Sequence, residues 1–217
     1  ISLGLGPGWT GSGGPWVKPE ESMKHIVAGS VDVSGGKTIE LTLPVPSPKA
    51  PYFGIPEEMK EQWENYYEDI ALLAIPRSEI RDSVPDIDEK ALYYRPPYTS
   101  VAGVKPYFIS SGHYPATGTK GLDRSHILDI SHLMDKNGKL RWEAPPGEWI
   151  LMRFVSRNNG ASTRPAPLPG LGFESDKFDK VSLNRHLDHF IGSLLMKSGT
   201  PDRNKRGGLK RLHMDSW

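Results

Sequence analysis

Residues 6–17 read GPGWTGSGGPWV, so two tryptophans and a serine stand among five glycines and two prolines. Glycine and proline form tight turns and leave no room for Cβ atoms. An indole offers a large apolar face and one N–H donor, a combination suited to stacking on a sugar ring. Trp9, Ser12 and Trp16 are therefore candidate substrate contacts. The alternative is a surface loop whose indoles pack under neighbouring elements.

Asp215 and Trp217 form a second group of candidate substrate contacts, at the other end of the sequence. A carboxylate at this position can accept hydrogen bonds from sugar hydroxyls or lie near a metal. Its alternative role is to follow a strand and cap the next helix. Glu174 and Asp176 are candidate site acids too, but we favour a structural role for them at the entry of a helix, where the helix dipole stabilises acids.

Residue spacing argues against two other kinds of site. Ser12, Ser110 and Ser111 lack the Gly-x-Ser-x-Gly frame that many serine hydrolases share. His186 and His189 lie three residues apart on the polar side of a predicted helix, which indicates a solvated pair rather than a metal site. We therefore assign no residue of this sequence to a metal.

The composition bounds the class of protein. The 217 residues carry 27 basic and 26 acidic side chains, and this balance gives no electrostatic argument for nucleic acid or an anionic membrane as a partner. Cysteine is absent, which excludes disulfides and thiolate metal sites. Twenty prolines and 23 glycines favour a loop-rich, mixed or mainly β fold. No apolar run approaches the length of a membrane span.

The first part of the chain predicts one β/α unit. Leu3–Leu5 is a short apolar run that predicts a strand, and the glycine-rich segment follows it. A helix is expected over Pro19–Ala28, because proline suits a first helical turn and acids follow it. The sequence begins with Ile1 and ends with Trp217 inside strand-like runs, so we expect a piece of a longer protein.

The middle of the chain predicts a β-sandwich-like module. Ile39–Val45 alternates apolar and polar residues as a half-buried strand does, and Pro56–Tyr67 predicts a short helix. Regular spacing with Gly/Pro turns, including the Asn-Gly pair before Lys139, indicates antiparallel sheets. The other predicted strands are Ile70–Ile75, Pro106–Ser110, His126–Ile130, Lys139–Glu143 and Trp149–Ser156.

The last part returns to β/α patterning. Asp179–Lys197 has the apolar spacing of an amphipathic helix, with Asp176 or Asp179 as its N-cap. Leu209–Met214 predicts a final strand. We expect a mixed, α+β fold in which residues 30–157 form a β-module inserted between a β/α unit at 1–29 and a returning helix and strand at 158–217.

Three blocks resemble the α-L-rhamnosidases of glycoside hydrolase family 106, and the likeness covers nearly the whole chain. They are Gly6–Trp9 with Ser12–Trp16, Arg153-Phe154 through Gly172–Lys177, and the terminal His213–Trp217. The resemblance implies a large bacterial enzyme, secreted or periplasmic, that acts on an oligo- or polysaccharide. It also implies a (β/α)₈ catalytic barrel, of which the two ends would be pieces and the β-module an insertion.

The resemblance also implies where substrate binds. The glycine-rich segment would be a βα loop at the C-terminal face of the barrel, and Met214–Trp217 would end another barrel strand. Leu3–Leu5 and Leu209–Met214 should then run parallel. The resemblance implies that such enzymes invert the anomeric centre and hold calcium near the sugar in the full-length protein, and it identifies no catalytic carboxylate in this sequence. The alternatives are a non-catalytic carbohydrate-binding β-sandwich and a structural spacer.

Overall fold

The structure is a computed structural model that describes residues 2–5, 11–51, 54–77, 122–163, 166–199, 202, 204, 206 and 211–214. The chain divides into two compact units. Unit one comprises Ile1–Val27, Pro48–Glu68 and Ser156–Trp217, and unit two comprises Ala28–Ser47 and Asp69–Val155. Residues 48–68 thus group with unit one, although the sequence placed them within the inserted module.

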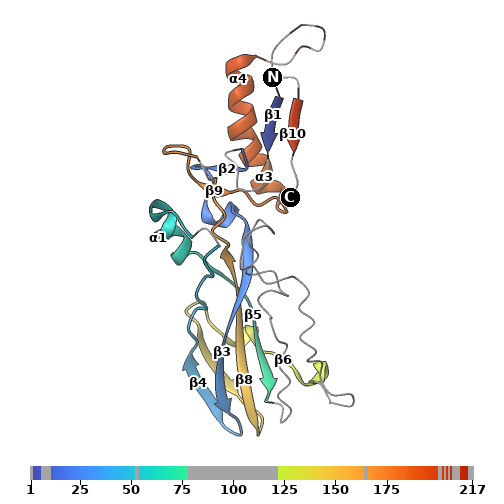
Figure 1. Ribbon diagram of the computed structural model, residues 1–217. Coiled ribbons are helices and arrows are strands. Elements are labelled where there is room, and N and C mark those ends of the chain that lie inside the picture. Colours follow the sequence, from blue (N-terminus) through green and yellow to red (C-terminus); the bar gives the residue numbers. More distant parts are fainter. Residues whose placement is uncertain are drawn as a thin grey trace, which may run out of the picture. The chain divides into compact units, whose positions relative to one another are not determined.

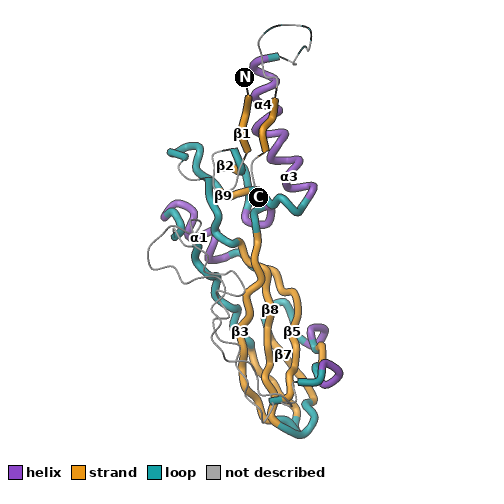
Figure 2. Tube along the Cα trace, turned by 45° about the vertical axis from the view of Figure 1, so that its right-hand side comes forward, coloured by secondary structure: helices purple, strands orange, loops and turns teal. Residues whose placement is uncertain are grey.

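Unit two is built from two β-sheets (Figures 1 and 2). The larger sheet has the strand order β3-β8-β5-β6, and the smaller sheet pairs β4 with β7 in antiparallel register, Ile39 opposite Trp142. The strands are β3 (Lys24–Ser34), β4 (Thr38–Thr42), β5 (Glu68–Pro76), β6 (Leu128–Asp129), β7 (Lys139–Glu143) and β8 (Glu148–Asn158). Residues 24–27 of β3, Glu68 of β5 and residues 156–158 of β8 belong to unit one. The antiparallel sheets predicted for this part of the chain are confirmed.

One apolar core lies between the two sheets of unit two. It contains inward-facing side chains of β4, β5, β7 and β8, because alternate residues of each strand face the same side. Trp142 and Trp149 meet edge to face, with ring centroids 5.4 Å apart. Burial of this apolar surface stabilises the unit. The fully or nearly buried members are Ile39, Leu43, Leu72, Ala74, Ile130, Leu140, Trp142, Ala144, Trp149 and Leu151.

Arg153 lies on β8, and its side chain is 1% exposed. The guanidinium donates to both carboxylate oxygens of Asp69, at 2.7 and 2.9 Å, and to the carbonyl oxygen of Leu43 at 2.8 Å. A buried cation is tolerated only when it is paired and hydrogen-bonded in this way. Arg153 therefore ties together two segments of unit two.

Unit one contains two small sheets and the helices (Figure 1). β1 (Ser2–Leu5) pairs with β10 (Arg211–Met214), and β2 (Gly13–Gly14) pairs with β9 (Phe173–Glu174). The predicted helix Pro56–Tyr67 is confirmed as α1 (Glu57–Asn65). The predicted helix Asp179–Lys197 is α3 (Lys180–Leu187), a π-helical turn (Asp188–Gly192) and α4 (Ser193–Ser198).

The predicted helix Pro19–Ala28 is wrong. Pro19–Glu21 form a single 3₁₀ turn, and β3 begins at Lys24. The proline and the acids do favour the start of a helix, but the helical conformation extends over this single turn only. The β-branched residues that follow favour an extended chain, and pairing with β8 overrides the weak helical spacing.

Two further strand predictions had different outcomes. The predicted strand His126–Ile130 is shortened to β6, between 3₁₀ turns at Arg124–His126 and Ser131–Leu133. The predicted strand Pro106–Ser110 lies outside the described residues.

Candidate functional site

β1 and β10 run parallel although about 200 residues separate them in sequence, as predicted for two strands of one barrel. Their register pairs Leu5 with Met214, so both strands end at the same edge of the sheet. The glycine-rich segment follows Leu5 directly, and Asp215 follows Met214. Two of the predicted site segments therefore follow, in sequence, strands that end at one edge of the sheet. Of the predicted site residues, Trp9, Asp215 and Trp217 lie outside the described part of the chain.

The described end of the glycine-rich segment packs backbone against backbone. β2 pairs with β9 in antiparallel register, Gly13 opposite Glu174. A Cβ on Gly13 would lie 1.9 Å from the carbonyl oxygen of Phe173, and a Cβ on Gly172 would lie 2.0 Å from the carbonyl carbon of Gly14. Glycine is required here because no side chain fits between the two strands.

Ser12 is buried and its hydroxyl is already engaged. It donates to Glu174 Oε1 at 3.1 Å, and the other oxygen of Glu174 accepts from Lys177 Nζ at 3.0 Å. The side chains of Lys177 and Glu174 are only 10% and 5% exposed. This buried ion pair fixes Ser12, and through it the glycine-rich segment. A direct contact of Ser12 with substrate stays a prediction.

Trp16 packs against α3 and the turn that follows it. Its indole stacks on the rings of His186 and His189, with centroids 5.8 Å away in each case. The indole N–H donates to His186 Nδ1 at 3.1 Å. The packed position matches the alternative considered for this loop, in which indoles pack on neighbouring elements. A role of Trp16 in binding sugar stays a prediction.

The prediction that His186 is solvated is wrong, because the residue is 2% exposed. Its Nε2 lies 2.9 Å from the carbonyl oxygen of Gly11, and its Nδ1 receives the Trp16 indole N–H. An indole N–H can only donate, so Nδ1 must be unprotonated and Nε2 must carry the hydrogen. Burial lowers the pKa of His186 from its ordinary value, which also favours the neutral ring.

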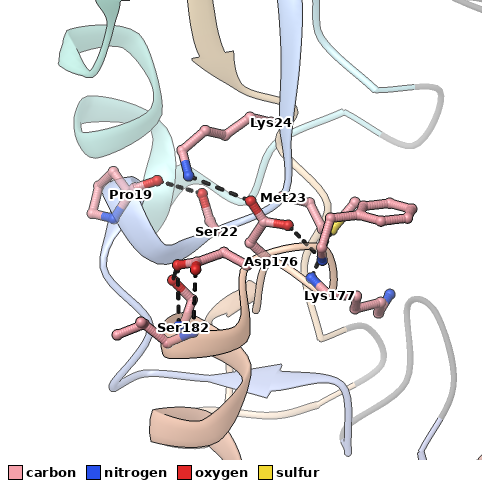
Figure 3. Close-up of polar contacts among 10 residues, drawn as sticks. Pro19, Ser22, Met23, Lys24, Asp176, Lys177 and Ser182 are labelled. Carbon is pink, nitrogen blue, oxygen red and sulfur yellow. Dashed lines mark hydrogen bonds and ion pairs between the residues drawn. The ribbon is translucent and has the colours of Figure 1, made fainter.

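The entry of α3 explains the other acids that the sequence singled out (Figure 3). Asp176 lies 3.5 Å from Lys24 Nζ and accepts from the backbone N–H of Phe178. Asp179 caps the helix by accepting from the N–H groups of Val181 and Ser182, so the predicted N-cap is confirmed. The hydrogen bonds from Ser182 and Val181 hold the pKa of Asp179 below its usual range. Asp176 and Asp179 are thus structural acids.

Sequence reasoning missed three residues that order this region. His186 and Lys177 hold the glycine-rich segment, and Arg157 holds the end of α1 through the carbonyl oxygens of Glu64 and Tyr66, at 2.9 and 3.0 Å. His186 and Arg157 contact residues distant in sequence, and Lys177 acts through Glu174, which accepts from the distant Ser12. No local pattern marks such residues, since helical spacing places His186 on the polar side of the helix.

Two properties of the described residues bear on cofactors and membranes. They contain no group of three or more histidine, aspartate or glutamate side chains that could hold a metal ion. Within the same residues, no helix is long and apolar enough to cross a membrane.

The chain is similar to known glycoside hydrolases. A sequence model of the alpha-L-rhamnosidase family matches residues 1–217. A protein of Formosa agariphila named "Putative beta-glucuronidase" is 30% identical over 193 residues, which make up 88% of this chain and 14% of that protein. The solved structure of the rhamnosidase from Novosphingobium sp. PP1Y matches with a TM-score of 0.65 and 17% identity, over 93% of this chain and 30% of that one. The chain therefore spans less than a third of the length of either relative.

Proposed function

The chain belongs to the alpha-L-rhamnosidase family, and from this we propose that the protein containing it removes terminal α-L-rhamnose from plant polysaccharides. The observation that carries the proposal is the parallel pair β1–β10. In parallel β/α folds, substrates bind beyond the carboxyl ends of the strands. β1 and β10 end at one such edge, and the glycine-rich segment and Asp215 follow them directly in sequence.

We place β1 and β10 as neighbouring strands of a (β/α)₈ catalytic barrel, with the helix formed by α3 and α4 as part of its outer layer. Unit two would then be a β-sandwich inserted between pieces of the barrel. Two observations favour this arrangement. In sequence, the segments of unit two lie between segments of unit one. The chain also matches the fold of a rhamnosidase over 30% of that protein's length. From the family resemblance, we place the whole protein outside the cell or in the periplasm.

The proposed reaction is inversion by two carboxyl groups. One protonates the leaving oxygen while the other activates a water on the opposite face, which requires a separation of about 6.5–9.5 Å. Glu174 does not suit either role, because it is buried and held by Lys177 and Ser12. We therefore place both carboxylates in other parts of the protein. Trp9, Trp16 and Trp217 would stack on sugar rings, and Ser12 and Asp215 would bind hydroxyls.

Calcium near the sugar remains a proposal for the full-length protein. The described residues contain no group of three or more histidine, aspartate or glutamate side chains that could hold a metal ion.

The test is hydrolysis of an aryl α-L-rhamnoside by the full-length protein, with and without calcium. We expect Asp215→Asn to lower kcat/KM by about 100-fold, since hydrogen bonds to a developing transition state have this magnitude. Asp188→Asn is the matched control, because Asp188 is an exposed acid in unit one. If the Asp215→Asn enzyme is as active as the wild type, the C-terminal end of β10 is not part of the active site.

An aryl β-glucuronide belongs in the same assay, because the Formosa agariphila relative carries that activity in its name. Residues 1–217 expressed alone should cleave neither substrate, since an incomplete barrel cannot hold the catalytic groups in position. Turnover by the isolated chain at the rate of the full-length protein would show that the site has been misplaced.

A non-catalytic carbohydrate-binding role is the second candidate. Unit two favours it, because two antiparallel sheets around one apolar core form a self-sufficient module. A full-length protein that binds polysaccharide but cleaves no glycoside would support this candidate over the first.

A further inference from the structure

His186 connects two points of the glycine-rich segment that lie five residues apart. It donates from Nε2 to the carbonyl oxygen of Gly11 and accepts at Nδ1 from the indole of Trp16. The two bonds use opposite sides of one ring, so a single side chain on α3 fixes both ends of residues 11–16. Only the neutral ring with its hydrogen on Nε2 can make both bonds.

We propose that His186 is a positioning residue, whose neutral imidazole holds the glycine-rich segment in the conformation that the active site needs and releases it in acid. The proposal rests on the function proposed above, because it gives the segment a role in the reaction. His186 itself is buried behind the segment and is not placed in contact with substrate.

The segment needs ordering contacts because it is rich in glycine. Gly11, Gly13 and Gly14 have no side chains and lose much conformational freedom when they are ordered. The β2–β9 pairing and the bond from Ser12 to Glu174 restrain the middle of the segment. The bonds of His186 restrain Gly11 and Trp16, on either side of that middle part.

The charged and titratable groups that face His186 set the direction of its response to pH. His189 lies on the next helical turn, and Lys177 lies on the segment before α3, paired with Glu174. Burial lowers the pKa of His186 most, His189 and Lys177 lower it further, and the bond to Gly11 raises it. The unfolded ring titrates near 6.5, so the contact is complete above that pH and weakens as the pH falls below it.

Three substitutions separate the two bonds of His186. Asn is expected to keep an acceptor near the position of Nδ1, and Gln to keep a donor near the position of Nε2, while Phe removes both. None of the three titrates. His189→Gln is the matched control, because His189 also stacks on Trp16 but is exposed and bonds within its own helix.

The experiment measures two properties of the full-length protein, rhamnosidase kinetics against pH and hydrogen exchange in peptides covering residues 11–17. We expect H186F to lower kcat by about 100-fold, the loss typical of a misplacement of about one ångström, with a smaller change in KM. H186N and H186Q should each recover about tenfold. Exchange in residues 11–17 should be faster in all three, and the wild type alone should show extra loosening as the pH falls below 6.5.

The outcomes are distinct. Wild-type kcat in H186F, or unchanged exchange in residues 11–17, would overturn the proposal, and so would an equal effect of H189Q. If H186F does not fold, H186N and H186Q decide by the same criteria. If the wild type cleaves no rhamnoside, the proposed function fails on its own. The exchange data then show whether His186 holds residues 11–17. The kinetics on whichever glycoside is cleaved show whether holding this segment matters for catalysis.

Discussion

The two units have different interiors. Among the described residues, Arg153 is the one polar side chain buried in unit two, and apolar residues make up the rest of that core. In its described part, unit one has a small apolar cluster around Trp63 and Phe173. Apart from Val27, its other described buried side chains are polar, and they are Ser12, Ser22, Arg157, Asn158, Ser162, Thr163, Glu174, Ser175, Ser182 and His186.

This contrast separates stability from positioning. Apolar burial is strong and non-directional, so unit two gains stability from any dense packing of its two sheets. Buried polar groups contribute little net stability, but each must meet its partner in one geometry. In unit one, His186 bonds to the backbone of the glycine-rich segment and Glu174 to Ser12 within it, whereas Arg157 and Thr163 bond to backbone carbonyls elsewhere in the unit. Unit one is therefore built to fix a conformation, and unit two to resist unfolding.

The largest effect expected from this contrast is that of Trp142→Ala. Trp142 is buried in the core of unit two against Trp149, and removing such a side chain costs about 3–5 kcal/mol. Hydrogen exchange should show lost protection in residues 38–42, 139–143 and 148–155 and unchanged protection in unit one. Equal loss of protection in both units would contradict the view that they are stabilised separately.

Gly13→Ala should have the next largest effect, confined to unit one. The added Cβ would meet the backbone oxygen of Phe173 at 1.9 Å, which backbone movement alone can relieve. We expect a loss of about 3 kcal/mol in protection around residues 11–17 and 172–175, the upper end of overpacking. Gly192→Ala is the control, because open space surrounds that helical glycine and alanine favours helix. A neutral Gly13→Ala would disprove the close packing of β2 on β9.

Acid should weaken unit one before unit two. Burial, with help from Lys49 and Arg157, lowers the pKa of His25 in unit one from 6.5 to about 4. The unfolded state binds more protons between these values, so stability falls as the pH drops from 6.5 to 4. After allowance for solvent screening of a half-buried ring, the loss is about 1–2 kcal/mol.

Exchange measured from pH 7 to 4.5, corrected for its intrinsic pH dependence, checks this expectation. The described histidines of unit two, His126 and His132, are exposed, whereas His25 is partly buried. His25→Gln should flatten the response of unit one. A greater loss of protection with falling pH in unit two than in unit one would contradict the expectation that acid weakens unit one first.

The same contrast explains how much the sequence could predict. β7 and β8 were predicted almost to the residue, because strict alternation and an Asn-Gly turn are local signals. Gly138 of that turn has a φ of +78°, which glycine adopts readily. β3 was mistaken for a helix because its strand character comes from pairing with β8, which no local window contains.

The polar interior of unit one could not be predicted for the same reason. Ser12 and Glu174 are 162 residues apart, and Trp16 and His186 are 170 apart. From sequence, a histidine on the polar side of a helix is expected to be exposed. It is buried only when another segment of the chain covers it, and helical spacing does not reveal that segment. The parallel pairing of β1 and β10 was predicted because a family resemblance supplied the non-local information that the two strands alone do not carry.

The smallest effect expected is that of Asp179→Ala. Asp179 accepts from two orphan N–H groups at the start of α3, and losing such a cap costs about 1 kcal/mol. Because α3 carries His186, fraying of its first turn should loosen residues 11–17 as well as the helix, although Asp179 touches neither Gly11 nor Trp16. Asp135→Ala in unit two is the matched control, since Asp135 accepts from the N–H groups of Asn137 and Lys139 in an exposed turn. Loosening of residues 11–17 by Asp179→Ala but not by Asp135→Ala would show that the helix positions the segment. Loosening of α3 alone would show that the cap and the segment are uncoupled.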